Sequence, residues 1–205
     1  MEKLLIETFC REGGRLLHLP YHRERICRSV GDAVPLEQFI EAVDAAATDL
    51  VATDPAANEG TWRVTVTYSE AGIEGVRMIP YQLPEIQKLR VIPLLRNFYS
   101  SKWADRSFFD GVKEFLYYGV EPLFTLNGLV TDTSFTNLLF EREGRLFTPK
   151  SYLLGGTKRA QLLDKGIVEE VEVTVDSISD YDRVHLVNAM LDPGELTVPT
   201  SNIIV

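Results

Sequence analysis

The chain has 205 residues, enough for one large domain or two small ones. Hydrophobic residues make up 45% of it, which allows a sizeable core and excludes wholesale disorder. The formal net charge of −9 disfavours binding to nucleic acids or anionic membranes, which need basic surfaces, although a local basic pocket can still hold a small anion.

The first half of the chain predicts a small sheet that two helices cover on one face. Alternating residues predict strands, the Gly13-Gly14 turn predicts a hairpin, and Pro20 and Pro35 each precede a helical pattern. The strands are predicted at residues 4–9, 15–19, 62–68 and 72–80, and the helices at residues 21–30 and from residue 35 onward.

Three prolines punctuate a poorly periodic stretch over residues 81–99, which predicts a connector with a domain boundary near Phe98. The domains are therefore expected at residues 1–98 and 99–205. In the second, the Asn127-Gly128 pair is a strong hairpin signal. Its strands are predicted at residues 122–126, 129–132, 137–141, 145–147, 168–175 and 184–187, and its helices at residues 107–118 and 158–165. Short strands with few helices predict an α+β chain whose second domain is barrel-like.

Four short motifs follow one another in this second half. Lys102 is followed four residues later by Arg106, and the strand pattern Gly128-Leu129-Val130-Thr131-Asp132 leads to Asn137-Leu138-Leu139-Phe140. Phe147-Thr148-Pro149 and Leu154-Gly155-Gly156-Thr157-Lys158-Arg159 come next. This order and spacing resembles the class IV aminotransferases, a pyridoxal-phosphate family that includes branched-chain and D-amino-acid aminotransferases and aminodeoxychorismate lyase.

The resemblance implies a D-amino-acid aminotransferase-like fold. It consists of a small N-terminal α/β sandwich domain and a C-terminal barrel-like domain, with pyridoxal 5'-phosphate bound between them. Typical members begin about two dozen residues earlier, so the resemblance leads us to expect an N-terminally shortened version of this fold. The strand segment Glu7-Thr8 is similar to the family's Phe-Glu-Thr strand.

Lys102 and Asp132 would carry the chemistry. In the family the lysine forms a Schiff base with the cofactor, which requires a partly desolvated and neutral amine. The alternative for Lys102 is a solvated surface lysine. Asp132 takes the place of the family's glutamate, which keeps the pyridine nitrogen protonated, so that the ring is a better electron sink. The alternative for Asp132 is an edge-strand carboxylate.

The resemblance assigns the cofactor phosphate to three segments. Arg25 lies in Tyr21-His22-Arg23-Glu24-Arg25-Ile26, which is similar to the family's His-x-x-Arg-Leu helix, and a guanidinium fork suits phosphate. The alternative is a solvated helix face. Gly156, Thr157 and Lys158 form a Gly-rich turn whose backbone amides can approach a phosphate, and the alternative is an ordinary Gly-rich helix start. Lys158 could donate a charge to the phosphate or point to water, and Thr157 could act as the helix cap. Asn188 and Ala189 would add backbone donors, while His185 beside them is expected to be a packed strand residue.

Arg106 bears on the substrate. A lysine followed four positions on by an arginine resembles the lyase branch of the family, and the arginine could bind a substrate carboxylate. The alternative is an ion pair with Asp105 or Asp110.

The sequence therefore predicts a pyridoxal-phosphate-dependent enzyme acting on a small amino-acid-like substrate, either as an aminodeoxychorismate lyase or as a transaminase. A degenerate relative without turnover is the second hypothesis, favoured by the short N-terminus, and a plain interaction module is the third. The resemblance also implies a homodimer. No metal-ligand spacing surrounds Cys10 or Cys27, and no targeting or membrane-spanning segment is evident, so we expect a cytoplasmic protein with neither metal, nucleic-acid nor membrane partners.

Overall fold

The computed structural model describes residues 4–205, which form two compact units. Unit 1 contains the chain up to Gln82 together with residues 101–105, and unit 2 contains residues 83–100 and 106–205. The sequence predicted domains at residues 1–98 and 99–205. Residues 83–98 instead belong to unit 2, and residues 101–105 belong to unit 1. Each unit has its own sheet system, so each is described separately.

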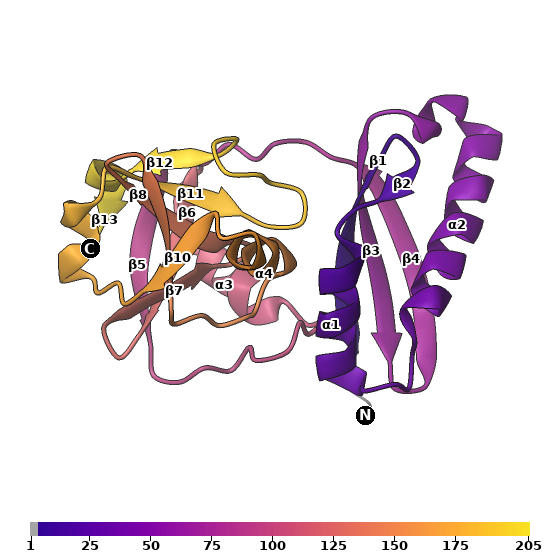
Figure 1. Cartoon of the computed structure of the whole chain (residues 1–205), viewed down its shortest axis with the longest axis horizontal. Helices are drawn as coiled ribbons and strands as arrows, with labels where there is room; N and C mark the ends of the chain where they lie inside the picture. Colours follow the sequence, from indigo (N-terminus) through magenta and orange to yellow (C-terminus); the bar gives the residue numbers. More distant parts are fainter. Residues whose placement is uncertain (1–3) are drawn as a thin grey trace. The chain divides into compact units, whose positions relative to one another are not determined.

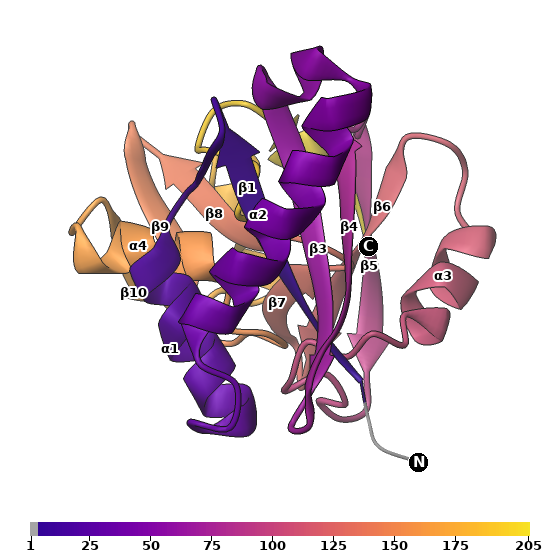
Figure 2. The same cartoon turned by 90° about the vertical axis from the view of Figure 1, so that its right-hand side faces the viewer.

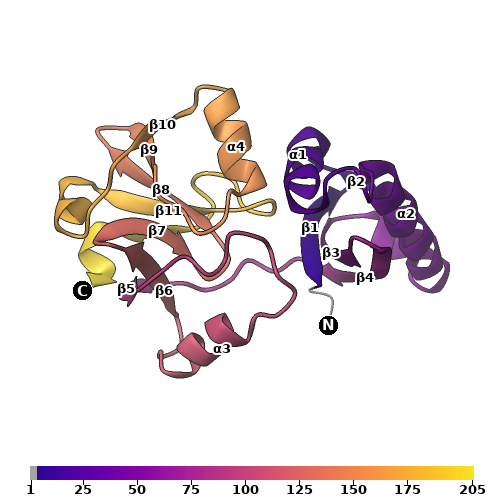
Figure 3. The ribbon, with the colours of Figure 1, turned by 90° about the horizontal axis from the view of Figure 1, so that it is seen from below.

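Unit 1 is an antiparallel sheet with two helices. Its strand order is β2-β1-β3-β4. The strands are β1 (Leu5–Glu12), β2 (Arg15–Leu16), β3 (Thr61–Ser69) and β4 (Gly72–Pro80), the helices are α1 (Leu19–Val30) and α2 (Leu36–Thr53), and a short 3-10 turn, η1, spans Pro55–Asn58. Figure 3 shows α1 and α2 on the same side of this sheet, and α2 packs over β3 and β4 (Figure 2).

The core of unit 1 forms where the helices meet the sheet. Phe9 and Val64 come from the sheet, Ile26 from α1, and Phe39 and Val43 from α2, and all are buried. The predicted apolar spacing of the second helix is thus confirmed, because its periodic residues are the ones that face the sheet. Residues 101–105 join this unit through β1, since Leu5 forms an antiparallel bridge with Trp103.

Unit 2 contains two sheets, and most of their strands are labelled in Figure 1. One has the order β13-β5-β6-β7 and the other β10-β9-β8-β11-β12. The strands of the first are β5 (Lys88–Leu94), β6 (Val120–Leu126), β7 (Leu129–Thr133) and β13 (Ile203–Ile204). Those of the second are β8 (Asn137–Arg142), β9 (Arg145–Pro149), β10 (Val168–Val171), β11 (Arg183–Val187) and β12 (Thr197–Pro199). The helical elements are α3 (Ser107–Glu114), α4 (Thr157–Asp164) and the short 3-10 turns η2 (Asp176–Asp180) and η3 (Thr200–Asn202).

Two features join these sheets into a barrel-like whole. The chain passes from β7 directly into β8, so the turn at residues 134–136 leads from one sheet into the other. Beyond β10 the chain changes partner, because Val130 donates to Val173 and Leu129 bridges Thr174. The predicted strand over residues 168–175 is therefore two pieces that pair with different sheets.

Other predicted elements differ in extent or nature. The stretch over residues 81–99, predicted as a connector, contains β5, which pairs in parallel with β6 and β13. The local sequence pattern does not reveal this strand, because its pairing partners are distant in sequence and it contains Pro93, which disfavours a strand prediction. The helix predicted to reach Tyr118 ends at Glu114, and the aromatic side chains of Phe115, Tyr117 and Tyr118 are exposed.

The Asn127-Gly128 hairpin is confirmed. Both residues have positive φ, 53° and 78°, as a type I′ turn requires, and Leu126 pairs with Leu129. Cys10 is buried, but Cys27 lies on the exposed face of α1 rather than in the core.

Candidate functional site

A buried polar cluster in unit 1 joins β1 to α1. Arg25 donates through Nε to Oε2 of Glu7 at 3.1 Å and through one terminal nitrogen to Oε1 at 2.6 Å. His22, one helical turn before Arg25, contacts Oε1 of Glu7 through Nδ1. Glu7 and His22 are fully buried and Arg25 is 6% exposed. The guanidinium fork therefore has a fixed orientation, and its other terminal nitrogen takes no part in the Glu7 contacts.

The charges in this cluster compensate one another. Burial raises the pKa of Glu7, but the Arg25 charge and the His22 contact outweigh it and lower that pKa to about 2. Burial lowers the pKa of His22, against the opposing influence of Glu7. With Glu7 ionised and His22 neutral, Nδ1 must carry the imidazole proton. Nε2 is then an acceptor, and it is buried without a partner in the described part of the chain.

Lys102 lies next to this cluster in the same unit. Its carbonyl accepts a hydrogen bond of 2.8 Å from the backbone of Ile6, the residue before Glu7. Its positive charge contributes to lowering the pKa of His22. Lys102 is half-buried rather than fully solvated. The structure thus brings together Lys102 and Arg25, two residues that are far apart in sequence.

Asp132 is the next-to-last residue of β7 in unit 2, and its side chain accepts hydrogen bonds from two directions. Asn137 donates through Nδ2 to Oδ1 at 2.8 Å, and the backbone amides of Leu153 and Leu154 both donate to Oδ2 at 2.9 Å. Asp132 is 5% exposed. These three donors occupy both acceptor positions of Oδ2 and one of the two on Oδ1, so one acceptor position of Oδ1 remains.

All three groups that contact Asp132 are neutral, and this determines its charge. Burial raises the pKa of Asp132 to about 6, because it outweighs the hydrogen bonds and the more distant charge of Arg159. A buried carboxylate held only by neutral dipoles would gain from a cation at its open position. The arrangement is suited to accept a hydrogen bond from a positively charged N–H group.

The start of α4 is packed against the same side chains. Asn137 also donates to the carbonyl of Leu154 at 3.0 Å, and a Cβ atom at Gly156 would collide with Oδ1 of Asn137. Gly156, with extended backbone angles, is the N-cap of α4, and no side chain caps the helix. The predicted role of Thr157 as the cap is therefore wrong, because Thr157 is already the first helical residue and is buried.

Lys158 and the turn after β11 meet at the same end of α4. The Lys158 side chain is 3% exposed, and Nζ donates to Oδ1 of Asp192 at 2.6 Å. Asn188 and Ala189 begin the turn that leads to Asp192, where Oδ1 of Asn188 accepts from the backbone of Met190 at 2.8 Å. The contacts thus link Asp132, through Asn137, to the start of α4, and link the start of α4 to the 188–192 turn, all within unit 2.

Arg106 borders the loop that follows Asp132. Its guanidinium donates to the hydroxyl of Tyr99 and to the carbonyl of Ser134, and lies 4.1 Å from the ring centroid of Phe109. These contacts fix its orientation. A half-buried cation held in this way presents its remaining N–H groups in a defined direction.

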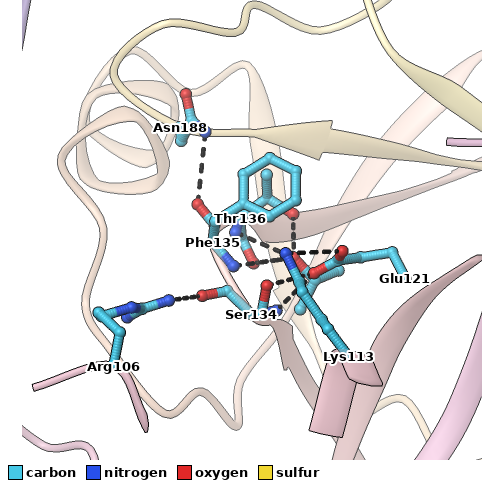
Figure 4. A network of polar contacts seen from close by, with 8 residues as sticks. Arg106, Lys113, Glu121, Ser134, Phe135, Thr136 and Asn188 are labelled. Atoms are coloured by element: carbon cyan, nitrogen blue, oxygen red, sulfur yellow. Dashed lines mark hydrogen bonds and ion pairs between the residues drawn. The ribbon is translucent and has the colours of Figure 1, made fainter. Parts of the chain in front are cut away.

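Glu121 anchors the same loop from the opposite side (Figure 4). Its buried carboxylate accepts from the backbone amide and the hydroxyl of Ser134, and pairs with Lys113 at 3.2 Å. Asn188 donates to the carbonyl of Phe135 at 3.3 Å. The loop between β7 and β8 is therefore held by side chains from several elements, including two of the predicted site residues.

The structure distributes the predicted residues over both units. Unit 1 holds Lys102 and Arg25. Unit 2 holds Arg106, Asp132, Gly156, Thr157, Lys158, Asn188 and Ala189. His185 is a buried residue of strand β11, in line with the predicted packed strand position. Its Nε2 lies 2.9 Å from Oε2 of Glu141.

Sequence reasoning assigned no role to Glu7, His22, Asn137 or Glu121. The signal for Glu7 was present, since it alternates with Leu5 and Phe9 on the buried face of β1. A carboxylate at a core position needs a partner, and the His-x-x-Arg spacing on α1 supplies two.

Comparison with known proteins agrees with this architecture. The family model described as "Amino-transferase class IV" matches residues 117–193, which include Asp132, the Gly-rich turn and Asn188. This part of the chain is therefore similar to the class IV aminotransferases. An uncharacterized protein of Haemophilus influenzae is 28% identical over 193 residues, which cover 91% of this chain and 97% of that protein.

Two solved structures share the fold. A candidate 4-amino-4-deoxychorismate lyase from Haemophilus somnus has a TM-score of 0.74 at 23% identity and covers 93% of this chain and 98% of its own. A hypothetical aminotransferase from Mycobacterium tuberculosis in its PLP-bound form also has a TM-score of 0.74, at 20% identity, and covers 98% and 81%. The chain thus has the fold of the class IV aminotransferases.

The residues of unit 2 fit pyridoxal phosphate in their chemistry. Asp132 offers an acceptor without a contacting cation, which is what a protonated pyridine nitrogen requires. Gly156 leaves the backbone at the start of α4 without a side chain, and helix starts favour anions such as phosphate. Among the described residues no His, Cys, Asp and Glu cluster is suited to a metal ion, and no helix there is long and apolar enough to span a membrane.

Proposed function

We propose that this chain is a pyridoxal-phosphate-dependent enzyme that acts on a small amino-acid-like substrate in the manner of aminodeoxychorismate lyase. The reaction would release pyruvate by β-elimination and leave p-aminobenzoate. Transamination of an amino acid is the alternative reaction for the same set of residues.

The observation that supports this proposal most is the state of Asp132. It is buried, its pKa is raised to about 6, and every group that contacts it is neutral. A cationic ring nitrogen at the open position of Oδ1 would supply the missing charge and keep Asp132 ionised at neutral pH.

The other residues have separate tasks. Bound pyridoxal phosphate supplies the electron sink for the reaction. Lys102 would hold the cofactor through its amine and take the proton from the substrate α-carbon. Arg25 would donate N–H groups to the phosphate, joined by backbone amides around Gly156, Thr157 and Lys158. Asn188 and Ala189 would provide further backbone donors.

Arg106 favours the lyase reaction over transamination. Tyr99 and Ser134 hold its guanidinium in place before any ligand arrives, so a substrate carboxylate would meet an ordered cation. This suits a substrate such as aminodeoxychorismate, which carries a carboxylate on its ring. Replacing Arg106 with Gln should raise KM for such an anionic substrate more than it lowers kcat.

The first test is an absorbance spectrum of the purified protein with added pyridoxal phosphate, followed by borohydride reduction and peptide mapping. The proposal predicts a visible band and a pyridoxyl label on Lys102, with neither in a Lys102→Ala variant. A label elsewhere, or no band, would exclude the proposed cofactor role of Lys102.

Product analysis separates the two reactions. Lyase activity gives p-aminobenzoate and pyruvate without an added keto acid, whereas transamination needs a keto-acid acceptor. A band and a Lys102 label without turnover of any amino substrate would favour the degenerate relative. We also propose that the chain works as a cytoplasmic homodimer, which analytical ultracentrifugation tests for its oligomeric state and cell fractionation for its location.

A further inference from the structure

Helix α1 carries two arginines that make very different ion pairs. Arg25 is buried and forms two hydrogen bonds with buried Glu7. Arg23, on the exposed face, pairs with Glu37 at 2.8 Å, and both of these side chains are more than 60% exposed. An exposed pair of this kind contributes little to stability or geometry, whereas the buried pair fixes the orientation of Arg25.

We infer that Glu7, with His22, is a positioning residue that orients Arg25 for the cofactor phosphate. This inference rests on the proposed function, because it concerns the same cofactor. Glu7 occupies Nε and one terminal nitrogen of Arg25, so the second terminal nitrogen points away from this fork. His22 contacts the same oxygen as that terminal nitrogen and prevents the Glu7 carboxylate from rotating.

The backbone extends this arrangement to Lys102. Ile6, next to Glu7 on β1, donates to the Lys102 carbonyl at 2.8 Å, and Ala104 donates to the carbonyl of Leu4 at 2.9 Å. The same strand therefore carries the residue that orients Arg25 and holds the backbone of the proposed cofactor lysine. A shift of the Glu7 side chain would disturb the proposed contact between Arg25 and the phosphate. The backbone hydrogen bond between Ile6 and Lys102 would remain.

A charge argument predicts the opposite effect and makes the inference testable. Glu7 is an anion, so on charge alone it should weaken the binding of a phosphate to Arg25. Replacing Glu7 with Gln would then strengthen phosphate binding. If Glu7 acts by positioning, the same substitution should weaken it, because one arm of the fork loses its acceptor.

The experiment compares pyridoxal phosphate with pyridoxal, which lacks the phosphate. Dissociation constants for both are measured from the absorbance band of wild type, Glu7→Gln, His22→Leu and the control Glu37→Gln, after thermal melts establish that each variant is folded. His22→Leu keeps the charges of Glu7 and Arg25, so it also covers the case in which Glu7→Gln does not fold.

In both cluster variants we expect the preference for pyridoxal phosphate over pyridoxal to fall about tenfold. This is the size expected for the loss of one charge-assisted hydrogen bond. Pyridoxal binding itself and the Glu37→Gln control should stay at the wild-type level. An unchanged or increased preference in the cluster variants would overturn the inference while the wild-type band still upheld the proposed function. No band in wild type would overturn both.

Discussion

Glu7 in unit 1 and Asp132 in unit 2 are both buried carboxyl groups, and their surroundings move their pKa values in opposite directions. Glu7 contacts a guanidinium and an imidazole, and its pKa is lowered to about 2. Asp132 contacts one side-chain amide and two backbone amides, and its pKa is raised to about 6. The first anion is compensated by charged partners, whereas the second has only neutral hydrogen-bond donors among the described residues.

The largest effect should come from removing the cation that compensates Glu7. Replacing Arg25 with Met leaves a buried carboxylate without its main partner, which typically costs about 3–5 kcal/mol of unfolding free energy. Chemical denaturation measures the loss. Arg23→Met on the same helix is the matched control and should change stability by less than about 1 kcal/mol. Equal losses in the two variants would show that the Glu7 pair is no stronger than a surface pair.

Acid should weaken unit 1 through Glu7. Its folded pKa lies below the ordinary value of 4.5, so its contribution is complete above pH 4.5 and is lost as pH falls toward about 2. The shift corresponds to about 3 kcal/mol at most. Denaturation curves between pH 5 and 2 should show a steeper loss in wild type than in Glu7→Gln. Parallel curves would contradict the lowered pKa.

Asp132 should have the opposite dependence. Its folded pKa is above the ordinary value of 3.8, so the folded state keeps a proton that the unfolded chain has lost. Stability therefore falls as pH rises from 3.8 to about 6. The stability of Asp132→Asn relative to wild type should therefore rise by up to about 3 kcal/mol between pH 4 and 7. A difference that does not change with pH would mean that Asp132 is already compensated.

A smaller effect should follow from filling the space at the start of α4. Gly156→Ala places a Cβ against Oδ1 of Asn137 and should cost about 1–3 kcal/mol by overpacking. It should also disturb the Asn137 contact with Asp132. Gly75→Ala on β4 is the control, because no atom lies within 4 Å of a Cβ there. Thermal melts of both variants measure the effect. Equal melting temperatures in the two variants would contradict a close contact between Gly156 and Asn137.

Much of this fold follows from local patterns. The alternation in β3, the apolar spacing of α2 and the Asn127-Gly128 turn each determine an element through neighbouring residues. Strand β5 was missed because its pairing with β6 depends on residues about thirty positions away. The strand predicted over residues 168–175 was too long because periodicity cannot show where a strand changes its partner.

The site could be predicted only in part. The motif order indicated Asp132 and the Gly-rich turn, and the structure brings these segments together through Asn137. Most of the contacts that shift the pKa values of Glu7 and Asp132 join residues that are far apart in sequence. No fixed spacing in the sequence therefore reveals them. Glu7 is the exception, because a carboxylate among the core positions of β1 signals a buried partner.

The contrast between Glu7 and Asp132 is tested most directly by measuring the pKa of Asp132 with and without pyridoxal phosphate. Carbon NMR of protein labelled at the aspartate carboxyl carbon gives this value, with the signal assigned from its absence in Asp132→Asn. We predict a pKa near 6 for the protein alone, falling below about 4 with the cofactor bound, because the ring N–H would then stabilise the carboxylate. The same pKa in both states would contradict the proposed pairing of Asp132 with the cofactor.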